Sequence, residues 1–169
     1  MPELTPKEFF QPSLLDRLTD NEPDKQREDM GRRVLTVEAL REIVLRDLDW
    51  LLNNPRSRAE MEEFERFPRA AKSVAAFGIP ALSGTTLGTI DTVELEKQVR
   101  DAVQHFEPRV LASSLKVRVN SNPDQMDHNA LTFEIEGDLL AQPLPERLLL
   151  KYAIDLETGK VEYRDAESS

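Results

Sequence analysis

The sequence predicts an α+β domain in which N-terminal helices are followed by a three- to four-stranded antiparallel sheet. Two observations support this prediction. Apolar residues recur three and four positions apart before Pro108, and they alternate with polar residues after it. The chain has 169 residues and no cysteine, which is enough length for one hydrophobic core without disulfide bonds. We expect a core domain over residues 34–169, preceded by an N-terminal arm over residues 1–33.

The arm contains an apolar cluster and then a polar stretch. Ser13 and Asp16 are spaced as an imperfect capping box, which predicts the start of a short helix. Residues 20–33 are almost entirely polar and charged, as in a mobile linker. The apolar cluster is either part of a loose terminus or an anchor that docks on this domain or on a partner. Its members are Phe9, Phe10, Leu14, Leu15 and Leu18.

The first long helix is predicted over residues 36–52. Apolar residues form one stripe along this segment, and charged residues fall on the other side. Residues 53–55, Asn-Asn-Pro, end the helix, because proline disfavours helical geometry in the preceding residue. The stripe consists of Val37, Leu40, Val44, Leu48 and Leu51, widened by Ile43 and Leu52.

Two shorter helical segments and one long helix follow. Ser57 and Glu60 form a capping box, so a short helix is expected through Phe64. A further turn or two is expected within residues 70–75, and residues 77–88 are predicted to be loop. The last helix begins after Asp91, and its apolar stripe is Leu95, Val99, Ala102, Val103 and Phe106.

Strict alternation then predicts the strands. The first is centred on residues 115–119 and the second on residues 131–135, with a long polar hairpin loop over residues 120–129 between them. Residues 148–156 form a third strand. Thr158-Gly159 is typical of a tight turn, and it leads into a fourth strand at residues 161–163.

Composition excludes several function classes. Thirty-two acidic and 22 basic residues give a formal charge of -10, so the chain should repel nucleic acid and anionic membranes. It shows neither a signal peptide nor an apolar stretch long enough to span a bilayer. We therefore expect a cytoplasmic protein with no nucleic-acid partner and no direct membrane insertion.

Signatures of catalysis are largely missing. His105 and His128 are not at metal-ligand spacing, and we expect no metal, no cofactor and no catalytic residue. Two carboxylates suffice for glycoside hydrolysis, but no acid is embedded in apolar sequence, and Glu134 and Glu136 should face solvent. The chain is predicted not to be an enzyme, with a hydrolase kept as an alternative.

Glu107, Pro108 and Arg109 stand where the helical pattern gives way to strands. Proline forces Glu107 out of helical geometry, and an extended chain there would project the carboxylate and the guanidinium to one side. The two side chains form either a local surface ion pair or a fixed polar plug for a partner protein. Arg109 is expected near the surface, where it contributes at most about 1 kcal/mol to folding.

These motifs, in this order, carry a resemblance to a known family. The chain resembles the TssE family of type VI secretion baseplate subunits and its phage counterpart, the baseplate wedge protein called "lysozyme-like". The resemblance runs over roughly residues 13–140. Its motifs are Leu14-Leu15-Asp16-Arg17-Leu18, the Leu-Leu-Asn that ends at Asn53, Ser73 to Phe77-Gly78-Ile79-Pro80, Glu107-Pro108-Arg109 and the strands around Val117 and Phe133.

The resemblance implies a structural role in a contractile injection machine. Such proteins join TssF, TssG and TssK in wedges, and the ring of wedges, docked at the inner face of the cell envelope, is the platform for the contractile sheath. The family's sheet resembles the attachment domain of sheath proteins, which implies that a sheath protein can add strands to it. The family's Glu-Pro-Arg motif contacts neighbouring wedge subunits. A lysozyme-like hydrolase and a generic cytosolic adaptor remain as alternatives.

The resemblance also defines a candidate partner interface and two departures. Ala81 stands where an acid often follows the family's Gly-x-Pro, and Pro55 interrupts the usual Asn-Thr-Arg continuation, so charge contacts at these points are not expected. The candidate interface residues are Leu14, Leu15, Leu18, Phe77, Gly78, Ile79, Pro80, Glu107, Pro108 and Arg109.

Overall fold

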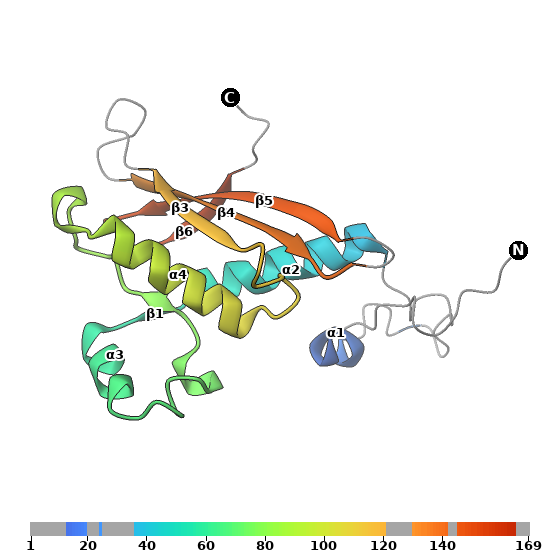
Figure 1. The fold of residues 1–169 in the computed structure, drawn as a ribbon, viewed down its shortest axis with the longest axis horizontal. Helices are drawn as coiled ribbons and strands as arrows, with labels where there is room; N and C mark the ends of the chain where they lie inside the picture. Colours follow the sequence, from blue (N-terminus) through green and yellow to red (C-terminus); the bar gives the residue numbers. More distant parts are fainter. Residues whose placement is uncertain (1–12, 20–23, 25–35, 121–129, 142–144, 165–169) are drawn as a thin grey trace, which may run out of the picture.

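The computed structural model describes residues 13–19, 24, 36–120, 130–141 and 145–164. A four-stranded sheet lies on a layer of two long helices (Figure 1). The predicted order, with helices first and an antiparallel sheet last, is confirmed. Phe9, Phe10, His128, residues 121–129 of the predicted hairpin loop and all of the predicted linker except Asp24 lie outside the described residues.

The sheet has the strand order β3–β4–β5–β6, and every neighbouring pair is antiparallel. Side chains along β4 alternate between buried and partly buried positions, as the period-two pattern predicted. The strands are β3 (Lys116–Asn120), β4 (Ala130–Leu139), β5 (Glu146–Asp155) and β6 (Val161–Arg164).

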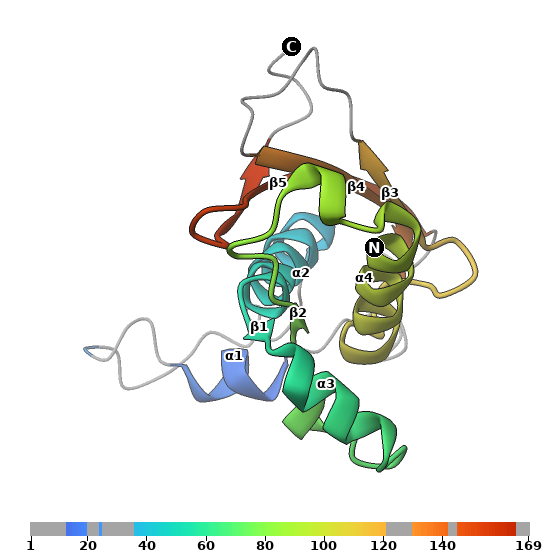
Figure 2. The ribbon, with the colours of Figure 1, turned by 90° about the vertical axis from the view of Figure 1, so that its left-hand side faces the viewer.

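Two amphipathic helices cover one face of this sheet (Figure 2). They are α2 (Val37–Leu52), which begins at the cap Thr36, and α4 (Thr92–Phe106), which begins at Asp91. Most of their predicted stripe residues form the core together with the inner side chains of the strands, whereas Val37, Ile43 and Phe106 are only partly buried. The buried helix residues are Leu40, Val44, Leu48, Leu51, Leu52, Leu95, Val99, Ala102 and Val103.

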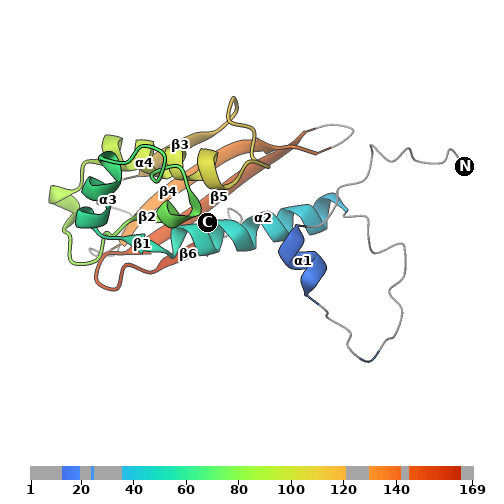
Figure 3. The same ribbon diagram turned by 90° about the horizontal axis from the view of Figure 1, so that it is seen from below.

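Two small helices lie beyond the helix layer, on the side away from the sheet (Figures 2 and 3). α1 (Leu14–Leu18) lies beside α2, and α3 (Arg58–Glu65) lies near the C-terminal end of α2. Both begin where the sequence predicted. Ser13 accepts from the Asp16 N–H, and the capping box of Ser57 and Glu60 is complete.

Residues 70–88, predicted as helical turns followed by loop, contain 3₁₀ turns and a short strand instead. The predicted turns at residues 70–75 reduce to a 3₁₀ turn over Val74–Ala76. The predicted loop contains a second 3₁₀ turn (Leu87–Thr89) and a two-residue strand, β2 (Ile79–Pro80). β2 pairs in parallel with β1 (Pro55–Arg56), a contact between distant segments that local periodicity cannot reveal.

Candidate partner-binding surface

The Glu107–Pro108–Arg109 loop begins at the C-terminal end of α4. Glu107 is the helix cap with φ -124° and ψ 73°, outside helical geometry as the following proline predicted. Its backbone N–H donates to Val103 O at 2.8 Å, and its carbonyl oxygen accepts from the Val110 N–H at 3.1 Å. The loop is therefore tied to both the helix before it and the chain after it.

The two charged side chains of this loop face each other, but not as a surface pair. Glu107 is only 2% exposed, and it is the one buried charged residue among the residues that the structure describes. Arg109 Nε donates to Glu107 Oε1 at 2.6 Å, and a second guanidinium N–H donates to Glu107 Oε2. The expectation of a local surface pair is therefore corrected. The pair is a two-pronged, largely desolvated contact, with Pro108 exposed between the two residues.

A second acid, from α2, completes the surroundings of Arg109. Asp47 Oδ2 accepts from the guanidinium at 2.6 Å, across 62 positions of sequence. Burial disfavours the charged guanidinium, but hydrogen bonds to Glu107 and Asp47 outweigh it and raise the pKa of Arg109 above its ordinary value. The side chain of Arg109 is 27% exposed, so one side of the fork still reaches solvent.

Asp47 also connects this loop to the arm. Its other oxygen, Oδ1, accepts from Arg46 Nε at 2.9 Å, and Arg46 donates to Asp16 Oδ1 of α1 at 2.5 Å. The five side chains form one chain of alternating charge. They are Asp16, Arg46, Asp47, Arg109 and Glu107. Sequence reasoning missed Arg46 and Asp47, because both belong to the polar side of a regular amphipathic helix.

The contact between Asp16 and Arg46 makes α1 sensitive to charge and to pH. Burial raises the pKa of Asp16, but hydrogen bonds from Arg46 and Ser13 outweigh it and lower the pKa below its ordinary 3.8. A carboxyl with a lowered pKa in the folded state stabilises that state above its unfolded pKa, and the stabilisation is lost as pH falls through the folded pKa.

We therefore expect Asp16→Asn to release α1 from α2 at pH 7, with little change in the melting temperature. The wild-type chain should release α1 only in acid, below pH 3.8. Hydrogen exchange of the Arg17 and Thr19 amides, which donate to Ser13 O and Leu15 O, measures the release. Glu38→Gln, at the far end of α2, serves as the control. Unchanged protection of both amides in Asp16→Asn would show that other contacts hold α1.

The apolar residues of α1 are not buried on the domain. Leu14 is 70% exposed, Leu15 46% and Leu18 75%. The polar side of α1 is bound to α2 through the ion pair of Asp16 with Arg46. An exposed aromatic residue, Trp50, lies on α2 with the guanidinium of Arg46 5.0 Å from its ring centre. The three leucines are therefore available to a partner.

The Phe77–Pro80 segment lies against the same end of α4. The ring of Phe77 meets that of Phe106, the residue before Glu107, edge to face at 5.3 Å. Gly78 has φ +125°, and a Cβ there would lie 2.1 Å from Asn54 O, so only glycine fits. Ile79 is buried in the core and donates its N–H to Asn54 O, whereas Pro80 is partly exposed. Within the candidate interface, Gly78 and Ile79 therefore have clear structural roles.

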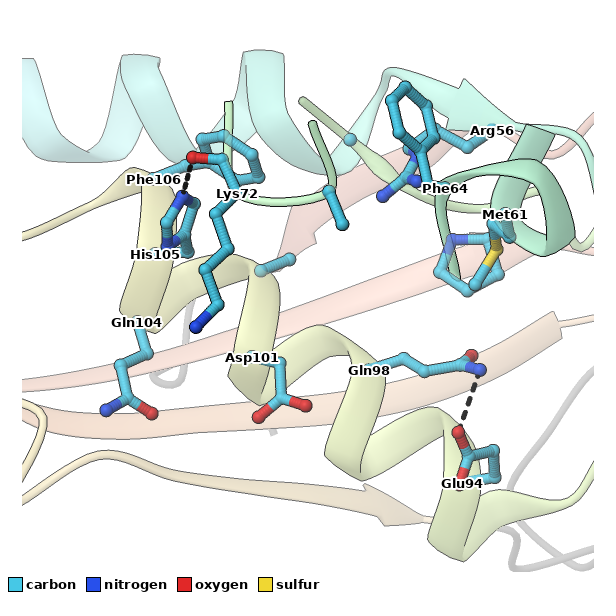
Figure 4. A pocket seen from close by; sticks show the side chains of 14 residues that line it. Arg56, Met61, Phe64, Lys72, Glu94, Gln98, Asp101, Gln104, His105 and Phe106 are labelled. Carbon is cyan, nitrogen blue, oxygen red and sulfur yellow. Dashed lines mark hydrogen bonds between the residues drawn. The ribbon is translucent and has the colours of Figure 1, made fainter. Parts of the chain in front are cut away.

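A groove of about 680 Å³ separates α4 from α3 and the segment that follows it (Figure 4). His105 Nε2 lies 2.5 Å from Lys72 O at one end, and Gln98 donates to Glu94 at the other. The side chain of Lys72 extends toward α4 between Gln104 and Asp101 (Figure 4). The described residues contain no group of three or more His, Cys, Asp or Glu placed to hold a metal ion.

The comparison with known families agrees with this geometry. Residues 38–144, more than half of the chain, match the family model of the baseplate wedge protein gp25. The chain belongs to this family. No curated protein and no solved structure matches the chain significantly. The predicted resemblance is therefore confirmed at the level of the gp25 family, and the α+β fold agrees with it.

Membership of the gp25 family gives the chain a structural role in a baseplate, in contact with other baseplate components. Such a role is compatible with a protein that has no catalytic activity. No helix in the described segments is long and apolar enough to cross a membrane. In this gp25-family chain, ion pairs through Arg46 and Asp47 connect the pair of Glu107 and Arg109 to α1, and Phe77 packs on Phe106 next to Glu107.

Proposed function

We propose that this chain is the TssE-type baseplate subunit of a bacterial type VI secretion system. It joins TssF-, TssG- and TssK-type subunits into wedges in the cytoplasm, at the inner face of the cell envelope. It also starts polymerisation of the contractile sheath by accepting a strand from a sheath protein. The observation that carries this proposal is an antiparallel sheet with two edge strands, β3 and β6, in a member of the gp25 family.

The wedge contacts are assigned to the candidate surface described above. Glu107 is buried, so it acts by holding the guanidinium of Arg109 in place. Exposed Pro108 and the open side of Arg109 meet the neighbouring subunit, together with the partly exposed Phe77 and Pro80. The exposed leucines of α1 supply an apolar anchor, since three such side chains on one short helix are stabilised by a covering partner.

The described acids support this structural role over hydrolysis. Glu134 pairs with Lys151 and Glu136 with Arg147 on the outer face of the sheet. Glu107 is the buried acid that the sequence did not reveal, and the guanidinium of Arg109 binds both its oxygens. A general acid has to release a proton to substrate, and Glu107 is placed to hold an arginine instead.

Fluorescently labelled sheaths, counted in the bacterium that encodes the chain, test the proposal. We expect deletion of the chain to abolish sheath assembly and the wild-type chain to restore it. Replacing Leu14, Leu15 and Leu18 by serine should leave the melting temperature unchanged but reduce the number of sheaths severalfold. Val93→Ser, at another exposed apolar position, is the control and should assemble normally.

Two results would contradict the proposal. One is normal sheath assembly in the deletion strain, which would favour an adaptor with another role. The other is clearing of a peptidoglycan suspension by the purified protein that is lost when one glutamate becomes glutamine, which would favour the hydrolase.

A further inference from the structure

The two edges of the sheet differ in how their backbone groups are occupied. At β6, the side chain of Asn53 binds both polar groups of Val161. Its Oδ1 accepts from the Val161 N–H at 2.9 Å, and its Nδ2 donates to Val161 O at 3.0 Å. A strand added at β6 would have to displace both bonds. Asn53 therefore closes this edge at one of the two positions of β6 that face outward.

At β3, a carboxylate rather than an amide binds the edge, and it binds one backbone group. Glu96 of α4 accepts from the Val119 N–H at 2.8 Å. Because bonded and non-bonded pairs alternate along an antiparallel ladder, this bond shows that Val117 and Val119 direct their backbone groups away from β4. Within the described residues, no other side chain binds these edge-facing groups. Within the described part of the chain, Glu96 is thus the one side chain bonded to the β3 edge.

The outer face of the sheet carries stripes of alternating charge that end at β3. Lys116 and Arg118 on β3 lie opposite Glu136 and Glu134 on β4, and Lys151 on β5 lies opposite Glu134. The carboxyl of Glu136 has a pKa below its ordinary value, because Arg147 donates a hydrogen bond and the positive charge of Lys116 lies near it. The order is positive, negative, positive, so a strand beyond β3 is favoured by negative charge on this face.

The inner side chains of β3 determine which residues an added strand needs on the core-facing side. Val117 is buried and Val119 is partly buried against the core. Side chains of an added strand alternate between the two faces, so those opposite these valines have to be apolar. The edge therefore fits an extended segment in which acidic and apolar residues alternate.

We propose that β3 is the edge that accepts the partner's strand, that this strand alternates acidic and apolar residues, and that Glu96 guards the edge until the strand displaces it. The inference rests on the proposed function, in which a sheath protein adds a strand. Glu96 keeps the edge from pairing with other chains, which is a recognised hazard of exposed edge strands. A backbone carbonyl of the added strand replaces the Glu96 carboxylate as the acceptor of the Val119 N–H.

A labelled seven-residue peptide of alternating glutamate and valine tests the inference with the full-length protein, and a lysine–valine peptide is its matched control. We expect the glutamate peptide to bind, and Glu96→Ala to tighten binding about five- to tenfold, since the peptide no longer displaces a charge-assisted hydrogen bond. Glu96→Gln, which still accepts a hydrogen bond, should fall between. Glu94→Ala, on the same helix, should bind like the wild type.

Amide exchange locates the bound peptide. In the free protein, Glu96→Ala should speed exchange at Val119, and the peptide should protect both Val117 and Val119. Equal binding of the lysine peptide, or no effect of Glu96→Ala on affinity, would overturn the inference. If the peptide protects the Val161 amide instead of Val119, and sheath assembly still requires the chain, the inference about β3 is overturned but the proposed function stands. If the peptide protects β3 but sheaths assemble without the chain, β3 still accepts an acidic strand, and the proposed function is refuted.

Discussion

Arg109→Ala should lower the free energy of unfolding by about 2–4 kcal/mol, because it leaves the Glu107 carboxylate buried without its cation. For a chain of this length, the melting temperature should fall by about 5–12 °C. Asp47 loses one partner but keeps Arg46. From the sequence alone, Arg109 is expected near the surface, and Arg109→Ala is expected to leave the melting temperature almost unchanged. The structure reverses that expectation, and a thermal melt of the purified protein measures it.

A matched set of variants separates folding from binding. Adding Glu107→Gln to Arg109→Ala removes the stranded charge and should restore most of the lost stability. Arg147→Ala removes an arginine whose pair with Glu136 is exposed, so it should change stability by no more than about 0.5 kcal/mol. Arg109→Lys should recover only part of the loss, because an ammonium cannot bind two carboxylates in the fork geometry.

The comparison between the single and the double variant then tests the interface. If the double variant melts like the wild type but assembles few sheaths, Arg109 has a role in partner binding beyond folding. An Arg109→Ala protein that melts like the wild type would show that Glu107 relaxes toward solvent, and the buried fork would not hold the loop.

The helices and strands were predictable because their signals are local. The 3.6-residue period of α2 and α4, the caps at Ser57 and Asp91 and the period of two in β4 each depend on residues within one element. The apolar stripes pointed to the right core for the same reason. β1 and β2 were not predicted, because two-residue strands whose paired residues, such as Pro55 and Ile79, are far apart in the sequence carry no periodicity.

The candidate site was predictable only in part. Sequence order and the proline placed Glu107 and Arg109 side by side at the end of α4, but the burial of Glu107 depends on packing that no local pattern reports. Asp47, Asn53 and Glu96 make their contacts 62, 108 and 23 positions away. Each is a polar residue on or next to an amphipathic helix, and such residues ordinarily face solvent.

Gly78→Ala should destabilise the protein more than Gly84→Ala or Gly88→Ala. An added Cβ would lie 2.1 Å from Asn54 O, which is a backbone atom and cannot swing aside, and alanine is strained at φ +125°. We expect a loss of at least about 3 kcal/mol in a thermal or denaturant melt. Gly84 also has a positive φ of +76°, but a Cβ there would meet no other atom, so Gly84→Ala should lower the free energy of unfolding by about 1 kcal/mol. Gly88→Ala has neither problem and should change stability by less than about 1 kcal/mol.

The ranking of the three variants by loss of stability distinguishes backbone strain from steric overlap with Asn54 O. The same variants test whether the disruption reaches neighbouring segments. Asn54 O accepts from Ile79, and Asn54 Nδ2 donates to Phe77 O, so pushing Asn54 aside breaks the pairing of β1 with β2 and frees the ring of Phe77. Phe77 packs on Phe106, next to Glu107. Gly78→Ala should therefore also speed exchange of the Glu107 amide, which donates to Val103 O, whereas Gly84→Ala should not. If Gly78→Ala lowers stability but leaves that amide protected, the Phe77–Pro80 segment and the Glu107–Arg109 fork are independent, and they act as two separate contacts rather than one partner-binding surface.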